Sequence, residues 1–314
     1  MGNEMTLLHT CSSIGLAGVV FSMVVAIGVV SAHAGQVQPI EISRGTLVSV
    51  VPYSTGAMVA ADSRETISGL YCDQRLKIRT PDGIENLVVA VTGSSRFYDL
   101  TALVGKGRVV TQPDLCSFVT AAPHLFDMES VVLDWLRGDG PKSAKDVSLD
   151  RLAAHCVERF AIFIAAYPQL APPPAPNGLM NVILVSYDPK SRETLVRDFR
   201  INRSAAGAVF SSDSAVYQYS PSTPSAFRLF GEADKFAQFV WPTFRSQRLR
   251  ADTRSLLSKQ VLTQDVTSLQ AEALAVDMIE QGADNPNLNT SEEGVGRPVR
   301  LVRIDTTGRP EMLR

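Results

Sequence analysis

The feature that most constrains the fold is a pair of apolar runs separated by one short turn. Thr46–Val51 is rich in β-branched residues, and Ala57–Ala61 is a second apolar run that follows Ser54-Thr55-Gly56. Because β-branched residues favour strands and Ser, Thr and Gly favour turns, these runs predict a β-hairpin. Opposed residues of an antiparallel pair have a constant number sum, and a turn centred at Ser54 or Thr55 predicts a sum of about 108 to 110.

The predicted register brings a hydroxyl and a carboxylate to one edge of the sheet. Thr46 begins the first strand and Asp62 follows the second, and 46 and 62 sum to 108. We therefore expect the two residues opposite or nearly opposite each other, with Cβ atoms about 5 Å apart if they pair directly. Taken alone, Thr46 is typical of an ordinary strand residue, and Asp62-Ser63-Arg64 of a turn with a solvated ion pair.

A second pair of runs follows the first hairpin. Arg75–Arg79 alternates apolar and basic residues, Pro81-Asp82-Gly83 predicts a turn, and Leu87–Val91 is apolar up to Gly93. Lys77 is expected to point away from the face of Leu76 and Ile78, together with its neighbouring arginines. Taken alone, a lysine among arginines is typical of an exposed face.

The remaining elements are helices and strands without regular β-α alternation. This order predicts an α+β fold with antiparallel sheets. A possible capping box at Thr267–Gln270 opens a helix that ends near Gly282, and Pro172–Gly178 is expected to be a surface loop. The other expected helices are 129–136 and 148–165, and the other expected strands are 181–185, 194–199 and 299–304.

The stretch RGTLVSVVPYSTGAMVAADSRETISG…QRLKI…LVVAVTGSS, which begins at Arg44, resembles the opening of a proteasome β subunit. It is also similar to the opening of the related bacterial peptidase of the chaperone-gated type. The later stretch AEALAVDMIEQGAD…GVGRPVRLVRI resembles the closing helix and strand of that family. The residues that match are Gly45 and Thr46 at the self-cleavage junction, Asp62 and Arg64 in the Asp-x-Arg motif, Lys77 at the central lysine, and Gly93 at the oxyanion glycine.

The resemblance implies a four-layer αββα sandwich, the N-terminal-nucleophile (Ntn) hydrolase fold, with antiparallel sheets inside and helices outside. It implies a threonine-type peptidase or amidohydrolase in which a freed Thr46 is the nucleophile and its α-amine is the base. Asp62 would hold Lys77, whose ammonium disfavours protonation of the amine, and the Gly93 N–H would stabilise the oxyanion. Gly45 and Arg64 would support the site. The implied partners are a peptide or amide substrate and further copies of the chain in a ring, and no cofactor or metal is expected.

Two later stretches depart from the family pattern. Phe230–Ala233 and Glu292–Gly296 stand where the family has supporting hydroxyl groups, and Val295 cannot supply one. The alternative is therefore a catalytically inactive subunit of the same fold with an assembly or binding role. A third hypothesis keeps the Ntn mechanism but replaces the peptide with a small amide.

The first 34 residues differ in kind from the rest. Ile14–Val30 is almost purely apolar and leads to Ser31-Ala32-His33-Ala34, a pattern typical of a secretory signal with its cleavage site. We expect 1–34 to be a signal peptide, 35–45 a connector or propeptide, and 46–314 one Ntn-hydrolase domain. Export to the periplasm or the cell exterior follows, and a retained membrane anchor is the alternative.

The remaining composition argues against other chemistries. Net charge is −2 without a basic stripe, which disfavours nucleic-acid binding. Of the two histidines past the leader, His155 is expected on the polar side of its helix, and no metal-ligand spacing is present. The cysteines beyond the leader, Cys72, Cys116 and Cys156, are odd in number and widely spaced, so we expect half-buried free thiols.

Overall fold

The computed structural model describes most of the chain after residue 39. The described residues are 40–42, 46–67, 70–99, 110–121, 124–138, 141, 143–174, 178–241, 251–258, 261–289 and 294–314. The chain divides into two units, Met1–Gln36 and Val37–Arg314, and all described residues lie in the second. The expected signal segment 1–34 and Gly45 therefore lie outside the described residues. Within the expected connector, Ile40–Ile42 forms strand β1.

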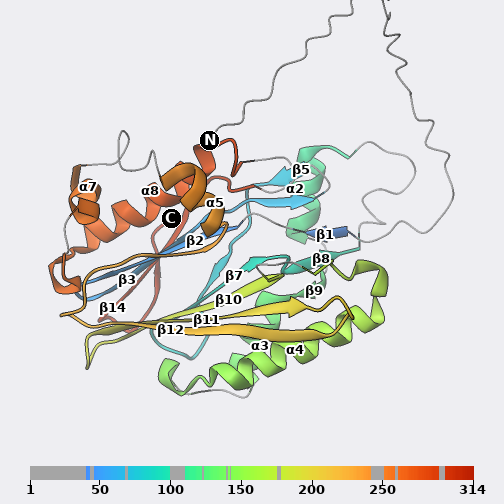
Figure 1. Cartoon of the computed structure of the whole chain (residues 1–314), viewed down its shortest axis with the longest axis horizontal. Coiled ribbons are helices and arrows are strands. Elements are labelled where there is room, and N and C mark those ends of the chain that lie inside the picture. The colour runs from blue at the N-terminus through green and yellow to red at the C-terminus, as the bar shows by residue number, and fades with distance from the viewer. Residues whose placement is uncertain are drawn as a thin grey trace, which may run out of the picture. The chain divides into compact units, whose positions relative to one another are not determined.

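Two five-stranded antiparallel sheets form the second unit (Figure 1). The first has the order β13 (Arg228–Gly231), β2 (Leu47–Tyr53), β3 (Gly56–Ala61), β14 (Arg300–Asp305), β15 (Glu311–Met312). The second has the order β12 (Val209–Tyr219), β11 (Glu193–Arg203), β10 (Met180–Asp188), β7 (Leu87–Gly93), β6 (Ile78–Arg79). Because every recorded strand pair is antiparallel, the expected α+β class with antiparallel sheets is confirmed.

Two small sheets and a set of helices complete the described structure. The small sheets are β1 with β8 (Arg96–Tyr98) and β9 (His124–Asp127), and β4 (Glu65–Ile67) with β5 (Leu70–Cys72). The helices are α2 (Gln112–Ala121), α3 (Met128–Gly138), α4 (Leu149–Ala166), α5 (Ala233–Lys235), α7 (Ala251–Ser258) and α8 (Ser268–Asp284). Short 3₁₀ turns cover Ala144–Asp146, Pro168–Leu170 and Thr263–Asp265, and a π-helical turn covers Phe236–Val240.

The two large sheets bury apolar side chains on both faces. Along β2, Val48 and Val50 belong to a cluster shared with the other sheet, whereas Leu47 and Val51 belong to a cluster shared with α8. A third cluster joins β7, β10 and β11 to α3 and α4, and Figure 1 shows these helices along one sheet and α8 along the other. Burial on both faces explains why the strands read as continuous apolar runs in the sequence.

Most of the expected elements are present, and their bounds differ only at the ends. The capping box of α8 is confirmed, because the Thr267 side chain accepts from Gln270 N at 3.2 Å and Gln270 Oε1 accepts from Thr267 N at 2.9 Å. The strand expected over Arg75–Arg79 is wrong for its first half, since only Ile78–Arg79 pairs with β7. The described strands and α-helices that the sequence did not predict are β1, β4, β5, β8, β9, β12, β13, β15, α2, α5 and α7.

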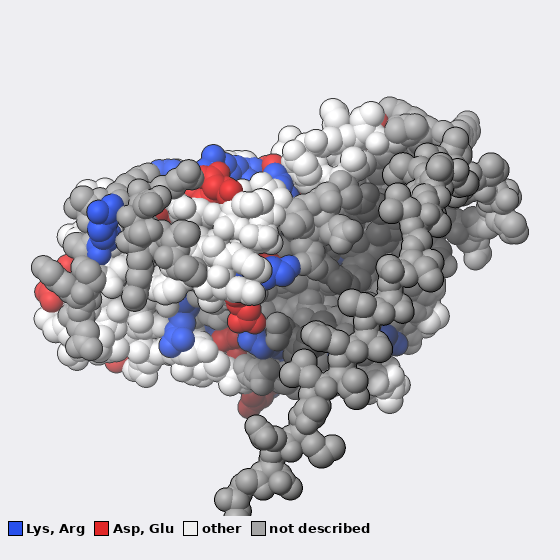
Figure 2. Space-filling model, turned by 45° about the horizontal axis from the view of Figure 1, so that its top comes forward, with Lys and Arg blue, Asp and Glu red and all other residues white. Residues whose placement is uncertain are grey.

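The described surface carries charges of both signs. On the face shown in Figure 2, basic and acidic side chains lie interspersed among uncharged ones. Exposed ion pairs such as Arg297 with Asp284 and Arg314 with Glu272 agree with this mixed pattern. Among the described residues, no helix combines the length and the hydropathy needed to cross a membrane.

Candidate active site

Thr46 lies immediately before β2, in a closely packed corner. Its side chain is buried, the residue being 1% exposed, and its Oγ1 has no hydrogen-bond partner among the described residues. Its carbonyl oxygen accepts from Glu232 N at 3.0 Å. Gly231 has a φ of +81°, and an added Cβ there would lie 1.8 Å from the Thr46 carbonyl oxygen. The corner between β13 and α5 therefore fixes the Thr46 backbone and needs a glycine to do so.

Asp62 lies one position from direct pairing with Thr46. The β2–β3 register pairs Val48 with Ala61, a sum of 109 that falls within the predicted range. Leu47 is therefore the residue opposite Asp62, and its N–H donates to Asp62 Oδ1 at 2.9 Å. The hairpin thus places Asp62 opposite Leu47, one position from Thr46, which agrees with the expectation that Asp62 and Thr46 are opposite or nearly opposite.

Lys77 reaches the same carboxylate from the segment before β6. Its Nζ lies 2.9 Å from Asp62 Oδ2, and both side chains are fully buried. Burial lowers the pKa of Lys77, and the charge of Asp62 opposes that shift. The interpretation of Lys77 as part of an exposed face is therefore wrong, and so is the solvated ion pair at Asp62-Ser63-Arg64.

Two backbone amides complete the surroundings of the Asp62 carboxylate. Oδ2 accepts from Arg64 N at 3.0 Å and from Gly296 N at 3.3 Å. The second contact comes from the loop that contains the fully buried Val295. In this chain a main-chain N–H reaches Asp62 from that loop, a contact that side-chain identities in the sequence do not indicate.

The Arg64 side chain contacts the neighbouring β4–β5 hairpin and the residue that follows it. Its Nε donates to Asp73 Oδ1 at 2.8 Å and its Nη2 to Asp73 Oδ2 at 2.9 Å, and it also pairs with Asn289. Its guanidinium lies 3.9 Å from the ring centroid of Tyr71. The hydrogen bond to Asp73 raises the pKa of Arg64. A Cβ at Gly296 would lie 2.5 Å from Arg64 Nε, so the loop approaches this ion pair closely.

Gly93 ends β7 in a conformation that only glycine adopts easily. Its φ is +82°, and an added Cβ would lie 2.2 Å from the Leu179 carbonyl oxygen. Ser94 N donates to that oxygen at 2.9 Å, so alternation along the antiparallel pair directs the Gly93 N–H away from β10. The preceding residue, Thr92, has its Cβ 3.3 Å from the Cβ position at Gly231, which also touches Thr46. The end of β7 therefore lies near the Thr46 backbone.

A buried cluster of charges lies beyond Gly93 and was not predicted. Glu129 at the start of α3 accepts from Arg75 at 2.7 Å and from Arg96 at 2.9 Å. Burial alone would raise the pKa of Glu129, but the guanidinium groups of Arg75, Arg96 and Arg79 outweigh it and hold the value at about 2. Arg96 also lies 3.2 Å from Asp127. The alternating pattern at 75–79 marks Arg75 as polar, but no pattern in one sequence pairs it with a residue more than fifty positions later.

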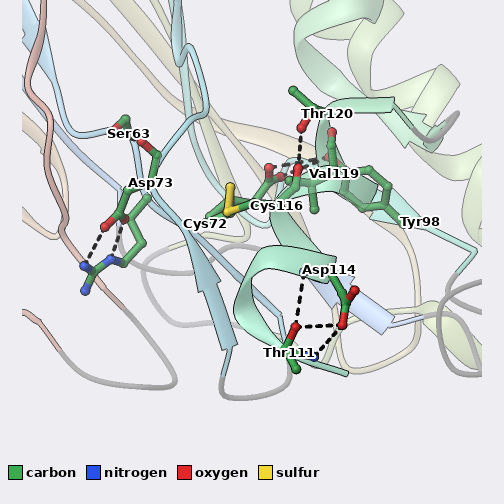
Figure 3. The surroundings of a disulfide bond; sticks show 11 residues. Ser63, Cys72, Asp73, Tyr98, Thr111, Asp114, Cys116, Val119 and Thr120 are labelled. Carbon is green, nitrogen blue, oxygen red and sulfur yellow. Dashed lines mark hydrogen bonds and ion pairs between the residues drawn. A yellow bond between two sulfur atoms is a disulfide. The ribbon is translucent and has the colours of Figure 1, made fainter. Parts of the chain in front are cut away.

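The expectation of free thiols is wrong for two of the three cysteines. Cys72 and Cys116 form a disulfide that joins β5 to α2, with Cα atoms 5.0 Å apart (Figure 3). The figure shows Asp73, the partner of Arg64, directly beside this bridge. Cys156 is a free, buried thiol, and burial raises its pKa to about 12. The three cysteines are thus one disulfide pair and one free core cysteine, and their spacing in the sequence alone does not distinguish this arrangement from three free thiols.

Comparison with known proteins gives no family assignment. Neither a protein-family model nor a curated protein matches the chain. Among the solved structures similar to the chain are two of Anbu. The Gly-1 mutant of Anbu from Hyphomicrobium sp. strain MC1 has 15% identity and a TM-score of 0.43, with 86% of each chain covered. Anbu (ancestral beta-subunit) from Yersinia bercovieri has 13% identity and a TM-score of 0.41, with 85% of this chain and 86% of the Anbu chain covered.

The assignment to the proteasome β-type family is therefore corrected. No family model covers the chain, and the similar structures named above are Anbu proteins at 13–15% identity. The sequence match is sharp only over the first fifty residues of the proposed domain, which is too short a stretch to fix a family. A likeness at this level assigns neither a family nor an activity to the chain.

Proposed function

We propose that the chain is an N-terminal-nucleophile hydrolase of the threonine type, acting on peptide or other amide bonds through a freed Thr46. The proposal rests on two observations: the Thr46 hydroxyl is buried without a partner among the described residues, and the next residue, Leu47, donates its N–H to Asp62 of the fully buried Asp62–Lys77 ion pair. A buried charged pair is costly to maintain, and perturbed pairs of this kind are concentrated at functional sites.

The proposed reaction uses the chain terminus as its base. The α-amine of Thr46 takes the hydroxyl proton as Oγ1 attacks the substrate carbonyl, and it then passes that proton to the departing amine. Water hydrolyses the resulting ester by the same route and restores Thr46. Lys77, held by Asp62, disfavours the protonated amine, and the Gly93 N–H stabilises the oxyanion. Every group in this scheme is supplied by the chain itself, so the proposed reaction needs no cofactor.

Several finer features belong to the same proposal. The clusters on both faces of each large sheet support a four-layer αββα order of helices and sheets. The disulfide supports export, because such bonds persist in oxidising compartments. We further propose that copies of the chain assemble into a ring. Light scattering on the purified protein tests the ring, and a lone monomer would overturn it.

The decisive experiment determines the N-terminus of the full chain by intact mass and N-terminal sequencing. The expected terminus is Thr46, and a Thr46→Ala variant is expected to remain uncut at this position. Thr66→Ala is the matched control, because Thr66 Oγ1 is likewise buried and has no partner among the described residues. This control is expected to be processed like the wild type. Turnover of a peptide panel and of small amides then separates the two substrate classes.

The runner-up function is a catalytically inactive subunit with an assembly or binding role. Its support is the near-complete burial of Thr46 and the absence of a hydroxyl at Val295. A terminus at Gly35 or Met1, with no turnover of any amide, would overturn the hydrolase and leave this second function.

A further inference from the structure

Arg75 connects three parts of the candidate site. Its backbone N–H donates to the Ser63 carbonyl oxygen at 3.0 Å. Its Nη2 donates to Ser95 Oγ at 2.8 Å and to Glu129 Oε1 at 2.7 Å. The Arg75 side chain is 1% exposed, so these contacts are shielded from water and electrostatically stronger than surface contacts.

Ser95 is the point at which Arg75 acts on the turn after β7. Ser95 N donates to the Gly93 carbonyl oxygen at 2.9 Å, and the Ser95 carbonyl oxygen accepts from Met128 N at 2.8 Å. Arg75 holds the Ser95 side chain as a third contact. Both backbone groups and the side chain of Ser95 are thus held, and Ser95 restrains Gly93, two positions earlier, through the Gly93 carbonyl oxygen.

The backbone of Arg75 lies close in sequence and in space to the Asp62–Lys77 ion pair. Ser63, whose carbonyl accepts from Arg75, directly follows Asp62, and Lys77 is two residues after Arg75. We propose that Arg75 is a positioning residue, which sets the Gly93 N–H relative to the Asp62–Lys77 pair by tying the segments that carry them. This inference rests on the function proposed above.

The charge of Arg75 gives the inference a second, measurable consequence. The largest charge effects on Lys77 come from Asp62, which directly follows β3, from Arg75, and from Glu65 in β4. Burial lowers the pKa of Lys77, Asp62 opposes this, and Arg75 lowers the pKa further. Removal of the Arg75 charge therefore raises the pKa of Lys77. Because the proposed mechanism uses the charged form of Lys77 to keep the Thr46 amine neutral, the pH profile of the rate is expected to shift in a variant without the Arg75 charge.

The experiment compares variants of the full chain with an internally quenched fluorescent peptide as substrate. Arg75→Lys keeps the charge but loses the forked geometry, so kcat is expected to fall about 10- to 100-fold with KM little changed and the pH profile in place. Arg75→Met is expected to lower kcat and also to shift the pH profile of the rate, because it removes a charge that acts on Lys77. Ser95→Ala removes only the hydroxyl that Arg75 binds, and it is expected to lower kcat by a smaller factor.

Arg96→Lys is the matched control, because Arg96 shares Glu129 with Arg75 but pairs with Asp127 instead of Ser95. It is expected to lower Tm about as much as Arg75→Lys while leaving the pH profile in place and kcat close to that of the wild type. If Arg75→Met fails to fold, the kcat values of Arg75→Lys and Ser95→Ala still test whether Arg75 is a positioning residue.

The two possible failures are distinguishable. If the wild type and Thr46→Ala release equally little product, the proposed function fails and the role of Arg75 fails with it. If the wild type turns over, but Arg75→Lys and Ser95→Ala match Arg96→Lys in kcat and pH profile, Arg75 is merely structural. That second result overturns this inference alone.

Discussion

Asp62 is the most connected group of the candidate site, and Asp62→Asn tests the reasoning most directly. Its carboxylate accepts from Leu47 N, Arg64 N and Gly296 N and pairs with Lys77. Asparagine keeps the shape but replaces one acceptor oxygen with an NH₂ group, which cannot accept a hydrogen bond from an ammonium. The substitution therefore leaves a buried cation without its partner.

The expected loss follows from burial of both members of the pair. Because Lys77 and Asp62 are 0% exposed, removal of one partner is expected to lower the free energy of unfolding by about 3–5 kcal/mol. Deprotonation of Lys77 limits that loss, since burial already lowers its pKa. Removal of both groups in Asp62→Asn/Lys77→Met is expected to recover about 2 kcal/mol or more of the loss, because no buried charge then remains.

Urea unfolding in a Thr46→Ala background measures these differences, because all variants then keep the same uncut terminus at this position. Peptide turnover is measured separately with Thr46 present, and both variants are expected to be inactive even where stability recovers. The reasoning is refuted if Asp62→Asn unfolds within about 1 kcal/mol of its parent, or if the two substitutions are simply additive. Either result would mean that Lys77 is not held by a buried ion pair.

Three further predictions test other parts of the structure. The pKa of Glu129 lies at about 2 instead of 4.5, so the Glu129 carboxylate contributes stability that is fully present above pH 4.5 and is lost as the pH falls towards 2. In Glu129→Gln the free energy of unfolding is therefore expected to fall by about 3 kcal/mol less across this window than in the wild type, as measured by urea unfolding at several pH values. The disulfide spans 44 residues, so Cys72→Ser/Cys116→Ser is expected to lower the free energy of unfolding by about 4 kcal/mol in the chain-entropy model, and equal stability of the two forms would contradict the bridge. Gly93→Ala places a Cβ 2.2 Å from the Leu179 carbonyl oxygen and is expected to reduce turnover at least about 100-fold. Gly83→Ala is the control for backbone strain alone, because Gly83 has a φ of +77° and an added Cβ would meet no atom within 4 Å; this variant is expected to retain turnover.

Local patterns were sufficient to predict the elements that carry the candidate site. The first hairpin has a short turn and β-branched strands, so its register could be calculated to within one residue, with the observed sum at 109. The helix after Thr267 has a capping box that is local in sequence and therefore readable. In both cases the residues that determine the structure lie within a few positions of one another along the chain.

The features that were missed depend on partners far away in the sequence. β12 lies at the edge of its sheet and contains Ser211–Ser214, a polar run typical of turns, and its strand conformation comes from pairing with β11. The Cys72–Cys116 bridge and the Arg75–Glu129 ion pair likewise join residues that only the fold brings together. A single sequence carries no signal for such pairs, so burial of Arg75 could not be inferred from its polar neighbours.

Because Thr46 is buried, self-cleavage of the chain and turnover of an added substrate become two separate questions, although the sequence motif implies both together. Self-cleavage needs the hydroxyl to reach only the adjacent Gly45 carbonyl, and a reaction within one chain gains from proximity without any substrate entering. Turnover needs a second molecule to reach a residue that is 1% exposed before the cut. A chain that cuts itself but stays closed would therefore carry a free Thr46 amine and hydrolyse nothing. It follows that the N-terminus reports the competence of the nucleophile, whereas only turnover of an added peptide reports access to it.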